Sequence, residues 1–201
     1  LFRSGAAGGA AIAASRMGLR TRAVGGVGTD LMGDWVLQRL AHFGVDVSGV
    51  QQRPGWRTSA SIVTTRADGT RPALHRPGAT ADFFVDDDQL PTVIDATVVH
   101  AGGVGLMDAM DGGRTAELLR SAQANGSITT VDVFAGSPDD LPAVASVLPH
   151  TDYFLPSVEE AEALSGLRDH ADIARFFLDR GARCCVLTLG DRGAYYHHDD
   201  G

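Results

Sequence analysis

Apolar residues recur along the chain with the spacing of short helices and strands in alternation. Residues 10–17 have helical spacing and stop at a glycine, and the apolar run 23–27, which ends in glycines, predicts a strand. Asp30 then offers an N-cap to residues 31–43, where apolar side chains recur at helical spacing until Gly44. The first part of the chain therefore predicts two helices with a strand between them.

The same alternation returns in the second half of the chain. It predicts strands at 98–101, 128–133, 153–155, 185–189 and 194–197, and helices at 114–124, 141–148, 159–164 and 173–180. Short apolar strands separated by helices imply right-handed crossovers and a mostly parallel sheet covered on both faces. The predicted fold class is α/β, a three-layer α/β/α architecture with a mostly parallel central sheet. Ligands of such sheets lie beyond the carboxyl ends of the strands.

Residues 47–79 differ in character from the rest of the chain. Serine and threonine mix with small apolar residues around Ile62 and Val63, and Asp68-Gly69 marks a turn, as in a β-hairpin. Strands with so few large apolar side chains do not suit the centre of a parallel sheet. We therefore expect a small β insertion at 47–79, a lid or interface flap, on an α/β core built from 1–46 and 80–201.

Composition is that of an ordinary globular protein, with 44% hydrophobic and 21% charged residues. The net charge is −8 and the 17 basic residues, all arginine, form no run, which argues against nucleic-acid binding. The absence of lysine excludes a P-loop, whose lysine reaches the β and γ phosphates. A nucleotide bound here must be held by backbone amides, arginines and hydroxyl groups.

Two features bear on location. The adjacent Cys184 and Cys185 lie in an apolar run, and neighbouring strand side chains point to opposite faces, so we interpret them as core thiols in a reducing, cytoplasmic compartment. The small apolar residues 5–14 are too few to span a bilayer, so no membrane association is expected. The chain begins with Leu1 and stops on a turn signal, and we expect both ends to be cut.

Two glycine-rich segments precede predicted helices. In residues 4–11, Gly5 and Gly9 would let a ligand approach unpaired backbone amides, although close packing of small residues explains the pattern equally well. Residues 25–33 lack the glycine spacing of a dinucleotide fingerprint, so NAD binding is rejected. The alternative for this second segment is a strand-to-helix turn capped by Asp30.

Three further candidates follow or end predicted strands. Ser157 can cap the next helix with Glu160 as the partner of a capping box, or Glu160 can hold Mg²⁺ through water beside a phosphate. Residues 188–193, Thr-Leu-Gly-Asp-Arg-Gly, follow a strand and turn on glycines, as a simple hairpin turn would. Asp132 ends an apolar strand and is either a strand-end cap or a residue that faces the ligand crevice.

The order and spacing of these segments resemble the ribokinase-like, or PfkB-type, carbohydrate kinases. That family has a glycine-rich signature before a helix, a GxGxD-x-x-G turn, a β lid, an N-x-x-E element and a TLG-x-x-G element. The corresponding segments here are 5–18, 26–33, 57–79, 157–160 and 188–193, so the resemblance spans essentially the whole chain. It implies ATP- and Mg²⁺-dependent phosphorylation of a hydroxymethyl group on a sugar or nucleoside. The β lid is in addition a candidate surface for a homodimer.

The resemblance also assigns roles to individual residues. It implies that Gly5 and Gly9 line the sugar site. It assigns the nucleotide site to residues of the last two elements, with Glu160 acting on Mg²⁺ through water: Ser157, Glu160, Thr188, Gly190 and Gly193. Three asparagines of the family are replaced here, by Gly9, Thr80 and Ser157. Each change removes an amide that would hold a sugar hydroxyl or position the metal shell.

The catalytic residue implied by the resemblance is not among these 201 residues. The family's base, an aspartate in a GAGD-like motif, is expected beyond Gly201, and a sugar-binding aspartate is expected upstream of Leu1. The chain alone is therefore expected to be inactive as a kinase. The alternative, which the three lost asparagines favour, is a catalytically silent kinase-like protein that binds a sugar or a nucleotide.

Overall fold

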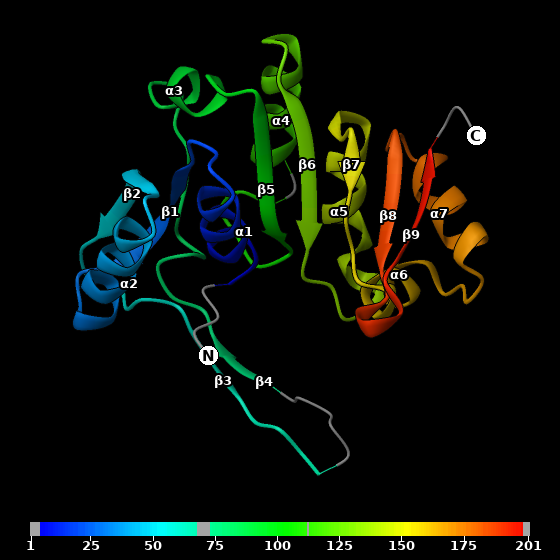
Figure 1. The fold of residues 1–201 in the computed structure, drawn as a ribbon, viewed down its shortest axis with the longest axis horizontal. Helices are drawn as coiled ribbons and strands as arrows, with labels where there is room; N and C mark the ends of the chain where they lie inside the picture. The colour runs from blue at the N-terminus through cyan, green and yellow to red at the C-terminus, as the bar shows by residue number, and fades with distance from the viewer. Residues whose placement is uncertain (1–4, 68–72, 112, 199–201) are drawn as a thin grey trace. The chain divides into compact units, whose positions relative to one another are not determined.

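The computed structural model describes residues 5–67, 73–111 and 113–198, which form two compact units (Figure 1). The first unit is Leu1–Phe84 and the second is Val85–Gly201. No helix among the described residues is long and apolar enough to cross a membrane.

The first unit is built on two parallel strands. Its elements are α1 (Gly5–Arg16), β1 (Arg22–Gly28), α2 (Leu31–His42) and β2 (Asp46–Arg53), with β1 and β2 paired in parallel from Arg22 opposite Asp46 to Gly28 opposite Arg53. Val27, Leu40 and Val45 are buried, so the apolar stripe of α2 packs towards the strands. The predicted helix–strand–helix order and the Asp30 cap are confirmed.

A hairpin follows this pair of strands. β3 (Ala60–Val63) and β4 (Ala73–Arg76) pair antiparallel, and Figure 1 shows them extending away from β1 and β2. The predicted turn at Asp68-Gly69 lies outside the described residues. Residues 47–53 of the predicted insertion belong to β2, which pairs in parallel with β1, whereas β3 and β4 form the antiparallel hairpin. The sequence did not indicate this pairing, because β2 is rich in polar residues and its partner strand lies in another segment.

The second unit contains a five-stranded sheet. Its strands are β5 (Val98–Val104), β6 (Ile128–Val133), β7 (Tyr153–Phe154), β8 (Cys184–Thr188) and β9 (Ala194–His198), in that spatial order. β5 to β8 are parallel, and β9 returns antiparallel to β8. The α/β class and the mostly parallel sheet are therefore confirmed.

Helices connect these strands. They are α3 (Leu90–Ile94), α4 (Arg114–Ala124), α5 (Leu141–Val147), α6 (Val158–Ser165) and α7 (His170–Leu178), with 3₁₀ turns η1 (Pro138–Asp140), η2 (Leu148–His150) and η3 (Gly190–Arg192). α3 was not predicted, because five residues are too few to show a helical period. Figure 1 shows α4, α5 and α7 on one side of the sheet.

The core of the second unit lies under that helical layer. Phe154 and Phe177 are fully buried and their rings lie 4.7 Å apart, joining β7 to α7. Cys184 and Cys185 are free thiols and both are buried, as predicted for core residues. Alternation along the strands places Val98, Ile128, Tyr153 and Tyr196 on the opposite face, where they are exposed.

Candidate functional site

The carboxyl ends of β7 and β8 bring two predicted site residues together. Ser157 and Thr188 form an isolated parallel bridge, and the Thr188 backbone N–H donates to the carbonyl of Pro156 at 3.0 Å. The residues are far apart in sequence, but parallel strands end at one edge of a sheet. This edge of the second unit is where ligands of open α/β sheets bind.

Ser157 and Glu160 form a complete capping box at the start of α6. The Glu160 Oε2 atom accepts from the Ser157 backbone N–H at 2.9 Å and from its hydroxyl at 2.6 Å, and the Glu160 N–H donates to Ser157 Oγ at 3.3 Å. Both side-chain contacts use Oε2, so Oε1 accepts none of the hydrogen bonds found among the described residues. The capping box therefore fixes the carboxylate and leaves one of its oxygens for a further ligand.

Asp132 adds a second carboxylate to this edge. It is the penultimate residue of β6 and is half-buried. Burial, followed by the negative charge of the nearby Glu160, raises the pKa of Asp132 from 3.8 to about 6. The sequence left Asp132 undecided between a strand-end cap and a crevice residue; the repulsion from Glu160 that helps raise its pKa puts it on the same side of the sheet edge as the start of α6.

The two carboxylates are suited to a hydrated cation. Mg²⁺ is typically held by one or two carboxylates together with water and substrate phosphates. Among residues 5–67, 73–111 and 113–198, no group of three or more His, Cys, Asp or Glu side chains could hold a metal ion by itself. Asp132 and Glu160 alone are too few ligands, so a cation bound at this edge would also need water or phosphate oxygens.

The turn after β8 carries two glycines in the left-handed region. Gly190 has φ +64° and Gly193 has φ +90°, and the Leu189 N–H donates to the Gly193 carbonyl at 2.8 Å. A Cβ atom at either glycine would meet nothing within 4 Å. The glycines are required by the backbone conformation, and the open space beside them lets a ligand approach the backbone closely.

Gly5 and Gly9 belong to the first unit. Gly5 begins α1, and Gly9 lies about one turn further along the helix, where it is exposed and a Cβ atom would meet nothing within 4 Å. Close packing of small residues therefore does not explain Gly9. Thr80, at the position of a family asparagine, is half-exposed, and its N–H donates to Ser59 Oγ at 3.2 Å.

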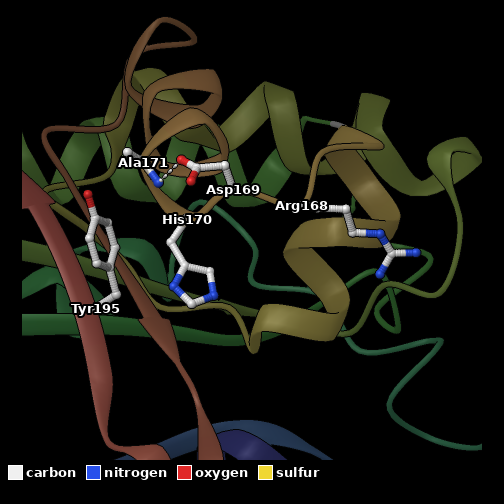
Figure 2. A pocket seen from close by; sticks show the side chains of 5 residues that line it. All are labelled: Arg168, Asp169, His170, Ala171 and Tyr195. Atoms are coloured by element: carbon white, nitrogen blue, oxygen red, sulfur yellow. Dashed lines mark hydrogen bonds between the residues drawn. The ribbon is translucent and has the colours of Figure 1, made fainter.

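A shallow hollow elsewhere in the second unit does not include the predicted residues. Its volume is about 320 Å³ and it is lined by Arg168, Asp169, His170, Ala171 and Tyr195. Figure 2 shows His170 and Tyr195 facing each other while Arg168 lies apart from them. Asp169 accepts from the Ala171 and Asp172 N–H groups as the cap of α7, and Arg168 pairs with Glu162. The two charged residues of this hollow, Arg168 and Asp169, are thus engaged in local structure.

An α/β protein with a glycine turn and paired carboxylates at its strand ends is a candidate phosphate- and cation-binding protein. The pfkB family carbohydrate kinase profile matches residues 2–201. The chain therefore belongs to the pfkB family, as its motifs predicted.

Individual relatives agree with this assignment. Fructokinase-1 of Zea mays is 30% identical over 98% of this chain and 64% of the relative, and the ribokinase of Staphylococcus aureus (strain COL) is 27% identical over 97% and 64%. The chain thus spans slightly less than two thirds of the length of these relatives.

Solved structures agree on the fold. The PfkB protein of Polaromonas sp. JS666 is 25% identical and matches with a TM-score of 0.78 over 96% of this chain and 69% of that protein. The ribokinase of Arabidopsis thaliana, solved with ribose and ATP, is 18% identical and matches with a TM-score of 0.79 over 96% and 63%. The ribokinase-like fold class is therefore confirmed.

Proposed function

We propose that this chain is part of an ATP-dependent kinase that phosphorylates a hydroxymethyl group of a sugar or sugar-like substrate. The observation that carries the proposal is the meeting of Ser157, Glu160, Thr188 and Asp132 at one edge of the sheet. Relatives named fructokinase and ribokinase support a sugar as the substrate class.

The second unit would bind the nucleotide. The Gly190 N–H would donate to a phosphate oxygen, with the exposed Thr188 hydroxyl and Gly193 beside it, because the Thr188 N–H already donates to the Pro156 carbonyl and the Gly193 N–H to the Gly190 carbonyl. Glu160 and Asp132 would hold Mg²⁺ through water. A bound Mg²⁺ would neutralise charge on the β and γ phosphates.

The first unit would bind the sugar near the start of α1, which begins at Gly5 and where a Cβ atom on the exposed Gly9 would meet nothing within 4 Å. In the transfer, the sugar oxygen forms a bond to the γ phosphorus, and the bond to the oxygen bridging the β and γ phosphorus atoms breaks, giving ADP. The hydroxyl proton passes to a carboxylate base, which the family resemblance places in a GAGD-like motif outside these 201 residues.

The hairpin of β3 and β4 would act as a lid that excludes water, whose attack on ATP would compete with the sugar.

The same hairpin would also mediate a homodimer. Ile62 and Leu74 pair across the two strands and are 66% and 75% exposed. A two-stranded hairpin with an apolar face needs a covering partner.

Light scattering would test the homodimer on the full-length gene product. Leu74→Asp should convert dimer to monomer, whereas Leu31→Asp, which places the same charge at an 88% exposed position on α2, should leave the dimer intact. Equal masses for both variants and the wild type would overturn the lid dimer.

A cytoplasmic location, with free buried thiols at Cys184 and Cys185, completes the proposal.

The main test is ADP release by the full-length gene product with MgATP and a panel that includes fructose, ribose and nucleosides. One sugar should stimulate ADP release and raise the midpoint of thermal unfolding. At 100 times its dissociation constant, a ligand adds about 2.7 kcal/mol of stability. If no compound changes either readout, the kinase proposal fails.

A second candidate is a catalytically silent protein that binds a sugar or nucleotide. The replacement of three family asparagines by Gly9, Thr80 and Ser157 favours it. Ser157, however, still caps α6 through its hydroxyl, as an asparagine would. A ligand that raises the unfolding midpoint without any ADP release would identify this second function.

A further inference from the structure

The Asp30 carboxylate does more than cap α2. Its Oδ1 accepts from the Gly33 N–H at 2.9 Å, which is the capping bond. The same atom accepts from the Thr58 hydroxyl at 2.6 Å, and Oδ2 accepts from the Thr58 N–H at 3.0 Å. A helix cap requires only the first bond, so the two bonds to a residue 28 positions later serve another purpose.

Thr58 lies just before β3, and both its N–H and its hydroxyl form hydrogen bonds with the turn that follows β1. Its hydroxyl oxygen also accepts from the Gly28 N–H at 3.0 Å, and the residue is only 9% exposed. A Cβ atom at Gly28 would lie 2.4 Å from the Trp56 carbonyl oxygen and 2.6 Å from the Thr58 nitrogen. The entry to the hairpin is therefore locked against the turn that follows β1.

The exit from the hairpin is locked to its entry. The Ala79 N–H donates to the Arg57 carbonyl at 2.9 Å, and Ala79 is fully buried. A Cβ atom at Gly78 would lie 2.3 Å from the same carbonyl oxygen. The Thr80 N–H donates to Ser59 Oγ at 3.2 Å, so the chain reaches Thr80 through contacts that begin at Thr58.

We infer that Asp30 is a positioning residue, which sets the base of the hairpin and, through it, the backbone at Thr80. The inference rests on the proposed function, since Thr80 occupies a position where the family resemblance implies a sugar contact. Hinge motion of the hairpin then takes place beyond Ser59 and before Gly78, because the residues nearer β1 are locked. Asp30 touches neither substrate nor nucleotide in this role.

The acidity of Asp30 agrees with this role. The Thr58 hydroxyl, the Thr58 N–H and the Gly33 N–H hold the pKa of Asp30 at about 2, so the carboxylate is ionised throughout the physiological range. Asp46 provides a matched control in the same unit. Arg22 and the Ser48 N–H hold its pKa at about 2 as well, but it lies at the amino end of β2.

The test compares Asp30→Asn, Thr58→Val, Thr58→Ser and Asp46→Asn in the full-length gene product. Hydrogen–deuterium exchange without ligand is measured first. The amides of 57–60 and 78–80 should exchange roughly tenfold faster in Asp30→Asn and Thr58→Val, as the loss of a charge-assisted hydrogen bond predicts. Thr58→Ser keeps the hydroxyl and should therefore exchange as slowly as wild type. Asp46→Asn should leave the exchange of these amides unchanged.

Kinetics for the sugar identified above are measured next. Asp30→Asn and Thr58→Val should raise the KM for the sugar roughly tenfold with a smaller change in kcat, while the KM for ATP stays the same. Unchanged exchange at 57–60 and 78–80 in Asp30→Asn would overturn the inference, as would equal increases in both KM values. If no sugar is phosphorylated by the wild type, the proposed function fails while the exchange comparison still tests the locked base.

Discussion

The turn after β1 and the turn after β7 both place a carboxylate at the start of a helix, but the two carboxyl groups meet opposite environments. Asp30 accepts three hydrogen bonds and its pKa falls to about 2. Glu160 accepts from Ser157 and lies near Asp132, whose pKa rises to about 6. A carboxylate saturated by donors holds the chain in place, whereas two crowded carboxylates favour a proton or a cation.

The largest expected effect on activity comes from a substitution at the neighbouring carboxylates Asp132 and Glu160. Glu160→Gln can keep the capping box, because a glutamine oxygen accepts the same bonds from Ser157, but it removes the charge. We expect kcat/KM of the full-length gene product to fall about 100-fold, with a higher Mg²⁺ requirement. Glu159→Gln removes the same charge from an exposed position in the same turn and should change activity little. Equal effects of the two variants would show that Glu160 only caps α6 and does not act on Mg²⁺.

The turn after β1, where Asp30 accepts its three hydrogen bonds, should also be sensitive to side-chain volume. Gly28→Ala places a methyl group 2.4 Å from the Trp56 carbonyl oxygen, and backbone must move to admit it. We expect a loss of about 2 kcal/mol in the free energy of unfolding, measured by urea denaturation. Gly25→Ala, on the same strand with nothing within 4 Å, is the control and should have a much smaller effect. Similar losses for both would show that the turn is not tightly packed.

The dependence of stability on pH should distinguish the two carboxyl groups. The pKa of Asp132 in the folded state, about 6, lies above the ordinary 3.8, so its stabilising contribution is present below pH 4 and is lost as the pH rises through 6. In metal-free buffer, wild type should lose about 1 kcal/mol relative to Asp132→Asn between pH 4 and 7, after allowance for solvent screening. Parallel stability curves for the two proteins would contradict this.

The smallest effect concerns Asp30 in acid. Its folded pKa of about 2 lies below 3.8, so its contribution is present above pH 3.8 and is lost as the pH falls through 2. Asp30→Asn should therefore have a flatter stability curve than wild type between these two pH values, followed by circular dichroism. A curve as steep as that of wild type would show that Asp30 is not held by its three donors.

Local patterns predicted much of the fold because helices and caps depend on neighbours in sequence. The strand at 128–133 and the helix at 114–124 were predicted with the bounds that the structure has. β2 was assigned to the insertion because its polar residues carry no clear alternation, and its partner β1 lies in another segment. Thr58 was missed as a contact of Asp30, since no local signal connects the two residues.

The sequence by itself determined the alternation of elements, the caps at Asp30 and Ser157, and the membership of the pfkB family. Only the tertiary structure decided that Thr58 completes the shell of Asp30 and that Asp132 lies near Glu160. The physical reason is one of range. Capping is decided within one helical turn, whereas the surroundings of a carboxylate depend on which distant segments the strand pairing and loop packing bring beside it.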